Sequence, residues 1–305
     1  MKFKRYRVAA SCFEPDLNHT IDKRRELLRI HVIELLKEQS PDLLVLPETT
    51  IVPDFDKHNF CASESISGPT VQMASGISKD FSTNICVSII ENDNGRLYNS
   101  TIYVNRSGSV AGKYRKAVPT SAERNLGIRP GEALQQPIVL DGMRIGTAIC
   151  FDCNYQDLLW NYISAGIDLM VFPSYTYGGK LMEFWAFSSG VPLICAFPWE
   201  SIIYDRDGNI LIQAGTRTST VEFGFHPRWI ACTLNLESRI YHLDGNQLIL
   251  KELFARYGGK IDVKLMEHDG RMMITVVSED IDIDQLEQEI HILPLQKYLR
   301  ESRIC

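Results

Sequence analysis

The segment MRIGTAI at residues 143–149 is a short apolar run typical of a buried strand, and Cys150 follows it directly. Residues 156–165, QDLLWNYISA, have apolar side chains at helical spacing, and residues 168–173, DLMVFP, form another apolar run. Strand, helix and strand in this order predict an α/β layered fold.

The same alternation extends along the chain in both directions from this segment. Thr20 is the expected N-cap of the first long amphipathic helix. Upstream, the pattern predicts helices over 20–39 and 70–80, and strands over 5–12, 43–47, 85–90, 98–104 and 110–114. Downstream, it predicts a helix over 181–189, a strand over 193–198, a hairpin turning at 205–208 and a strand over 229–236. These elements predict one main α/β domain over residues 1–245.

The C-terminal residues 246–305 have a different pattern. They predict a helix over 247–256, a hairpin turning at 268–270 and a helix over 283–289. We interpret them as an appended α+β subdomain or dimerisation arm.

Composition excludes several classes of protein. The chain has 305 residues, 45% of them hydrophobic, and a net charge of −6 with scattered basic residues, which argues against a nucleic-acid surface. No run approaches the length of a membrane span, and the first residues lack the apolar core that is expected of a secretory signal. Eight widely separated cysteines indicate reduced thiols in a cytoplasmic protein.

Three polar residues follow predicted strands, where α/β sheets collect ligands: Glu48, Lys116 and Cys150. Taken singly, each has an ordinary explanation as a surface acid, a solvated base or a small buried thiol. Taken together, they form a possible nucleophilic site. Glu48 can accept the thiol proton, and Lys116 can favour the thiolate and the oxyanion. The backbone N–H of Phe151 is the expected second oxyanion donor.

The sequence resembles the nitrilase, or carbon–nitrogen hydrolase, superfamily at three motifs. They are Pro47-Glu48, the block from Leu97 to Lys116 (LYNST at 97–101 and GKYRK at 112–116), and AICFD at 148–152. The resemblance covers roughly residues 5–236.

The resemblance implies a four-layer αββα sandwich that dimerises through its helices, so we expect a homodimer or higher homo-oligomer. It also implies a Glu–Lys–Cys catalytic triad and a second glutamate just beyond the lysine, a place that Glu123 fits. A carboxylate beside Lys116 would keep its ammonium charged. The implied chemistry is that of a thiol amidohydrolase with a small amide and water as reactants, needing no cofactor and no metal.

Departures from the family pattern concern the substrate. Val118 stands where many members have histidine, and Asn154 and Tyr155 stand where an arginine and a phenylalanine are common. This favours a short linear amide over an N-carbamoyl amino acid or a nitrile, which remain alternatives within the family. Asn154, Tyr175 and Tyr177 are the candidate substrate contacts, and packing is the alternative role of the two tyrosines.

Three other functions remain open at this stage. Cys150 and Cys153 form a Cys-x-x-Cys pair, so the chain could be a thiol-disulfide redox protein. It could instead be an inactive binding homologue, or it could transfer its acyl group to a separate amine.

Asp152, between the two cysteines, is expected to be a structural hydrogen-bond acceptor rather than a catalytic acid.

Overall fold

The computed structural model describes residues 4–52, 62–215, 228–244 and 246–303. Within these ranges the strands form two six-stranded sheets and one three-stranded sheet. The first sheet has the order β12 (Trp229–Asn235), β1 (Arg5–Ser11), β2 (Leu43–Val45), β3 (Asn84–Asp93), β4 (Arg96–Val104) and β5 (Val110–Arg115). The second has the order β11 (Ile210–Gly215), β10 (Glu200–Tyr204), β9 (Leu193–Ala196), β8 (Leu169–Pro173), β7 (Met143–Thr147) and β6 (Ile138–Leu140).

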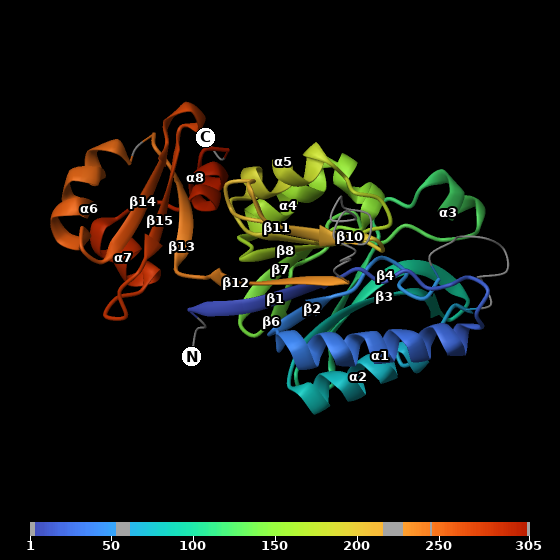
Figure 1. The fold of residues 1–305 in the computed structure, drawn as a ribbon. Helices are drawn as coiled ribbons and strands as arrows, with labels where there is room; N and C mark the ends of the chain where they lie inside the picture. Colours follow the sequence, from blue (N-terminus) through green and yellow to red (C-terminus); the bar gives the residue numbers. More distant parts are fainter. Residues whose placement is uncertain (1–3, 53–61, 216–227, 245, 304–305) are drawn as a thin grey trace, which may run out of the picture.

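The two large sheets stack between two helical layers (Figure 1). The helices α1 (Ile21–Gln39) and α2 (Pro69–Phe81) pack on the outer face of the first sheet, and α4 (Gln156–Ala165) and α5 (Lys180–Ser189) pack on that of the second. A separate apolar cluster, which includes Tyr6, Tyr103 and Ile194, fills the space between the sheets. The fold is therefore the αββα sandwich that the resemblance implies.

Local sequence explains where the elements begin and turn. Thr20 is the N-cap of α1, as predicted, because its side chain accepts a hydrogen bond from the Lys23 N–H. Asn94 and Gly95 have φ angles of 52° and 81°, which suit the tight turn between β3 and β4. Each of the parallel pairs β1–β2, β2–β3, β7–β8 and β8–β9 ends at the same edge of its sheet, which brings the following residues together.

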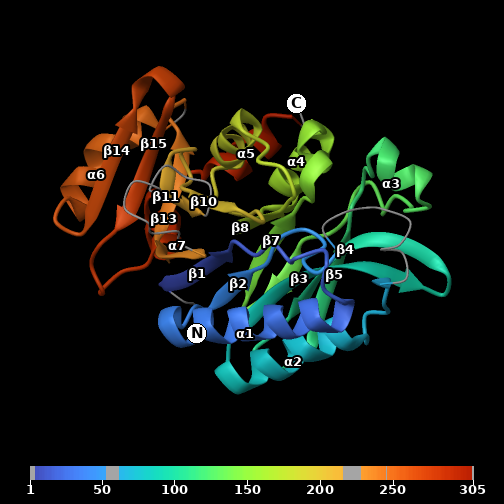
Figure 2. The ribbon, with the colours of Figure 1, turned by 45° about the vertical axis from the view of Figure 1, so that its right-hand side comes forward.

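The C-terminal part forms its own small layer of structure beside the sandwich (Figure 2). The sheet order is β13 (Ser238–His242), β15 (Arg271–Val276) and β14 (Ile261–Met266). The helical segments are η4 (Gln247–Ile249), α6 (Leu250–Tyr257), η5 (Glu267–Asp269), α7 (Ile283–Ile290) and α8 (Leu295–Glu301). A cluster that includes Leu253, Met272 and Leu286 is the core of this part. The domain boundary at residue 245 stays a prediction, although β13 precedes it and pairs with β15, which follows it.

Five short elements were not predicted: β6, α3 (Ser121–Asn125), the 3-10 helix η2 (Cys150–Asn154), β13 and α8. Each has seven residues or fewer, so its side-chain pattern covers too few positions to show a period. Among the described helices, none combines the length and the apolar character that a bilayer crossing requires.

Candidate active site

Cys150 lies just beyond the carboxyl end of β7, at the start of the short 3-10 helix η2 (Cys150–Asn154). Its φ angle is 48°, in the left-handed region that residues other than glycine rarely adopt. Its Sγ lies 3.5 Å from the hydroxyl of Thr176, which follows β8. Such strain costs roughly 1–3 kcal/mol and clusters at functional sites, so the backbone marks Cys150 as more than a packing residue.

Glu48 lies beyond the carboxyl end of β2 and is 1% exposed. The chain turns sharply there: Thr49 has a φ of 41°, and the hydroxyl of Thr50 donates to the carbonyl of Pro47 over 2.7 Å. The turn directs the Glu48 carboxylate across to the other sheet. Its Oε2 accepts a hydrogen bond from the backbone N–H of Tyr175 over 2.8 Å.

Lys116 is also 1% exposed, and its ammonium lies between two carboxylates. Its Nζ is 2.9 Å from Oε1 of Glu48 and 2.8 Å from Oε2 of Glu123. Burial alone would lower the pKa of Lys116, but Glu48, Cys150 and Glu123 raise it above its ordinary value. Lys116 therefore remains an ammonium at neutral pH.

The backbone around Lys116 is fixed on both sides. Its N–H donates to the carbonyl of Asn99, and its carbonyl accepts from Gly131, both over 2.8 Å. A Cβ at Gly131 would lie 2.4 Å from the carbonyl oxygen of Arg115, so only glycine allows this approach. This explains the glycine at position 131.

Glu123 reaches the site from α3, where it also closes a capping box with Thr120. Asn99, on β4, donates from Nδ2 to Oε1 of Glu48 over 2.7 Å and to Oε1 of Glu123 over 2.8 Å. Asn99 belongs to the LYNST motif at 97–101, but the sequence analysis assigned no role to it. Its position within a predicted strand was the available indication, because a buried amide side chain needs hydrogen-bond partners.

Replacing Asn99 by alanine is expected to lower the free energy of unfolding by about 1–3 kcal/mol, because two buried carboxylates each lose a donor. Urea unfolding at neutral pH measures this change. The matched control is Asn94→Gly, which removes an amide side chain from the exposed β3–β4 turn and tolerates its φ of 52°, so it should shift the unfolding midpoint less. Equal stability of Asn99→Ala and the unmodified protein would contradict the bridging role.

Electrostatics couple Cys150 to the other two groups. Burial raises the pKa of Cys150, the charge of Glu48 raises it further, and Lys116 opposes the rise. The structure thus brings the three predicted residues into one interacting cluster. Because the net shift is upward, the thiol is protonated at neutral pH, and a base must remove its proton before attack.

Asp152 holds the cysteine segment against the lysine segment. Its carboxylate accepts hydrogen bonds from the N–H groups of Ile149 (3.0 Å) and Val118 (2.8 Å) and from the Tyr114 hydroxyl (2.8 Å). Burial raises the pKa of Asp152 to about 6, and these donors oppose the rise. The expected structural role of Asp152 agrees with this geometry.

The remaining predicted residues lie around the cluster. Phe151 follows the nucleophile within η2, and Asn154 is exposed and donates to the Phe151 carbonyl over 3.0 Å. The ring of Tyr175 packs on Trp199 with centroids 5.1 Å apart, and that of Tyr177 packs on Phe197 at 5.0 Å. Both tyrosines therefore have packing partners, and their role as substrate contacts stays a prediction.

Iodoacetamide labelling at a series of pH values tests the state of the thiol. We expect Cys150 to react before Cys12, Cys86, Cys153 and Cys195, because those four are buried whereas Cys150, like Cys232, is half-buried. Its raised pKa predicts a labelling rate that keeps increasing at pH values where an exposed reference thiol has levelled off, since raising the pH produces the thiolate. Peptide mapping gives the site and the rate.

A labelling midpoint below that of the reference thiol would show that Cys150 rests as a thiolate, against this account. If Cys150 and Cys153 both became unreactive to iodoacetamide because they had formed a disulfide, the redox alternative would be favoured. In the structure both thiols are free.

No group of three or more potential metal ligands occurs in the part of the chain that the structure describes.

Comparison with known proteins adds family information. The family model described as carbon–nitrogen hydrolase matches residues 9–223. Human omega-amidase NIT2 is 28% identical over 144 residues, which are 44% of this chain and 52% of the human protein. The alignments with the first curated relatives cover between 26% and 52% of those proteins, so the chain spans about half their length at most.

Two solved structures share the fold. The carbon-nitrogen hydrolase from Helicobacter pylori G27 has a TM-score of 0.67 at 17% identity, covering 83% of this chain and 94% of that chain. An amidase mutant from Nesterenkonia sp. AN1, with the acetamide moiety of fluoroacetamide added covalently at the active site cysteine, has a TM-score of 0.58 at 19% identity and covers 76% and 90%. At these identities the likeness concerns the fold alone.

Proposed function

Since the chain belongs to the carbon–nitrogen hydrolase family, we propose that it hydrolyses a non-peptide carbon–nitrogen bond of a small linear amide through a thioester on Cys150. One observation carries this proposal above the others. A buried ammonium, Lys116, lies between the carboxylates of Glu48 and Glu123 and interacts electrostatically with Cys150. This arrangement brings together a base (Glu48), a cation (Lys116) and a nucleophile (Cys150) in one cluster.

In the proposed acylation step, Glu48 removes the thiol proton while Sγ of Cys150 attacks the amide carbonyl carbon. The negative charge that develops on the carbonyl oxygen is stabilised by Lys116 and by the backbone N–H of Phe151. Glu48 then gives its proton to the departing nitrogen. The carbon–nitrogen bond breaks, ammonia or an amine leaves, and the acyl group remains on sulfur.

In the proposed deacylation step, Glu48 removes a proton from water as the water oxygen attacks the thioester carbon. The carbon–sulfur bond breaks, the carboxylic acid leaves, and the proton on Glu48 returns to the thiolate. Glu123 positions Lys116 and balances its charge through the 2.8 Å ion pair. None of these steps consumes an oxidant or needs a group beyond the chain and water.

A short linear amide is the proposed substrate class. The absence of an arginine at position 154, where Asn154 stands, removes one ready partner for a substrate carboxylate. The names of two similar proteins, omega-amidase and deaminated glutathione amidase, support amide chemistry, whereas a relative from Lupinus angustifolius is named bifunctional nitrilase/nitrile hydratase. N-carbamoyl compounds and nitriles are the second candidates.

A screen for ammonia release tests the proposed function. The panel contains short aliphatic amides, ω-amides, N-carbamoyl amino acids and nitriles, each run beside Cys150→Ala. We expect turnover of the short amides by the unmodified protein and none by the variant. Turnover confined to N-carbamoyl compounds or nitriles would refute the substrate class and keep the chemistry. Turnover accelerated by added hydroxylamine or amines would indicate acyl transfer.

We also propose that the protein works as a cytoplasmic homodimer. All six described cysteines are free, which suits a reducing compartment. The exposed aromatic side chains of Phe151 and Phe184, on η2 and α5, lie on the outer helical layer through which the family resemblance implies association.

A further inference from the structure

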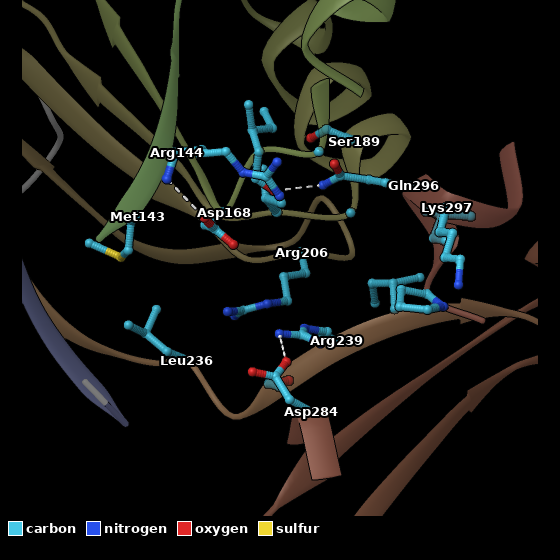
Figure 3. Close-up of a pocket in the computed structure, with 18 of the residues that line it drawn as sticks. Met143, Arg144, Asp168, Ser189, Arg206, Leu236, Arg239, Asp284, Gln296 and Lys297 are labelled. Atoms are coloured by element: carbon cyan, nitrogen blue, oxygen red, sulfur yellow. Dashed lines mark hydrogen bonds and ion pairs between the residues drawn. The ribbon is translucent and has the colours of Figure 1, made fainter. Parts of the chain in front are cut away.

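A cavity of about 690 Å³ lies at the junction of the sandwich and the C-terminal part (Figure 3). One wall comes from the residues that lead into β7, β8 and β9, including Arg144, Asp168 and Ser189. The other wall comes from β13, α7 and α8 of the C-terminal part. Small-molecule sites commonly have this volume and lie at such junctions.

The cavity is separate from the proposed catalytic cluster. Arg144 lies at the beginning of β7, whereas Cys150 lies beyond its carboxyl end. A strand of this length, 5 residues, spans roughly 16 Å at about 3.3 Å per residue. A ligand in the cavity would therefore not occupy the space around the cysteine.

Arg206 is the unusual residue of this cavity. It lies in the turn between β10 and β11, where side chains are normally solvated, yet it is 5% exposed. Among the described residues its ion-pair partner is its neighbour Asp205, at a distance of 3.6 Å. A guanidinium has five N–H donors, and this one ion pair engages only part of them.

The surroundings favour an anion next to Arg206. Figure 3 shows its side chain extending into the cavity between Leu236 and Asp168, with Arg239 nearby. Burial lowers the pKa of Arg206 to about 10; Asp205 and Asp168 oppose the decrease, and Arg239 adds to it. An anion between the two guanidinium groups would offset both effects.

Three other charged groups of the cavity already have partners. Arg239 is held by Asp284 at 2.6 Å and by Glu287 at 2.7 Å. Asp168 accepts the backbone N–H of Arg144 over 2.8 Å. Asp141 is paired with Arg106 at 2.9 Å. Arg206 is thus a buried cation of the cavity whose ion pair within the described residues is the 3.6 Å contact with its sequence neighbour Asp205.

The turn that carries Arg206 is fixed to the C-terminal part. Asp207, the next residue, forms a 2.5 Å ion pair with Lys264 of β14. The side chain of Asp207 in this pair is 3% exposed. This contact holds the turn in place, so the guanidinium of Arg206 is positioned before any ligand arrives.

We propose that this cavity binds a small organic anion, a carboxylate or a phosphate ester, whose charged group is held by the guanidinium of Arg206. The planar fork of arginine matches both anions through paired N–H donors. Leu236 and Met143 give the rest of the ligand an apolar wall. Because the ligand would contact both the sandwich and the C-terminal part, its binding would stabilise their junction.

Isothermal titration calorimetry on the full chain tests this site. The probes are inorganic phosphate and succinate, at constant ionic strength set with sodium chloride. We expect at least one of them to bind with a stoichiometry of one per chain, and the tighter probe identifies the anion class. Arg206→Gln should weaken binding at least tenfold (about 1.4 kcal/mol), whereas Arg29→Gln, on the exposed face of α1, should leave it unchanged.

Leu236→Trp provides a second variant that keeps Arg206 and fills part of the cavity, for use if Arg206→Gln does not fold. It should weaken the same binding. Cys150→Ala should bind the probe as the unmodified protein does, because the cavity lies at the other end of β7. Absence of binding of both probes at tens of millimolar, or unchanged affinity in the Arg206→Gln or Leu236→Trp protein, would overturn the proposal.

Discussion

Cys150→Ala is expected to reduce turnover by about 10⁴-fold or more, since it removes the atom that bonds to the substrate carbonyl. The variant should remain folded. Alanine keeps the Cβ and tolerates the same backbone angle of 48° as poorly as cysteine does, so the strain is unchanged. Loss of one sulfur atom from a half-buried position costs at most a few kcal/mol. Ammonia release and circular dichroism measure the two outcomes.

Cys153→Ala is the matched control for this experiment. Cys153 lies in the same short helix η2, is 5% exposed, and has no part in the proposed bond changes. Its replacement should therefore keep turnover while lowering stability. Equal loss of activity in the two variants would indicate a function that needs the Cys-x-x-Cys pair.

Glu48→Gln is expected to lower turnover by about 10²–10⁴-fold, because the amide cannot accept the thiol proton. The side chain has nearly the same shape, so its packing is kept. One structural change is also expected. The carboxylate accepts from Tyr175 through Oε2, and an amide NH₂ at that position would face another donor. Ammonia release measures the loss of turnover, and titration of the Cys150 thiol in the same variant shows whether the altered hydrogen bond also changes the state of the thiol.

Glu237→Gln is the control for loss of a buried carboxylate. Glu237 is 3% exposed and accepts the backbone N–H of Ile283 over 2.6 Å, in the C-terminal part. The Glu237→Gln substitution should lower the free energy of unfolding and leave the turnover per folded molecule unchanged. Wild-type turnover by Glu48→Gln would refute the assignment of Glu48 as the base.

The sequence predicts the sandwich well because its long helices show their period and its central strands, such as β2 and β8, are continuous apolar runs. The helix over 156–165 agrees with α4 at both ends. The strands β13 and β6 were missed for a physical reason. Each is short, and its pairing depends on partners that are distant in sequence, such as β15 for β13.

The candidate site was predictable in part. Glu48, Lys116 and Cys150 follow strands whose carboxyl ends meet in the fold, and strand ends are visible in a sequence. The bridge made by Asn99 was not predictable, because it joins Glu48 and Glu123 across three separate segments. The burial of Arg206 was not predictable either, because a turn that contains two aspartates and a glycine normally lies in solvent.

The most direct test of the catalytic account is peptide mass spectrometry of the protein quenched in acid during turnover of a short amide. The account predicts an added acyl mass on the peptide containing Cys150, and its absence from the same peptide of Cys150→Ala. An acyl mass on a different residue, or steady ammonia release by Cys150→Ala, would contradict it.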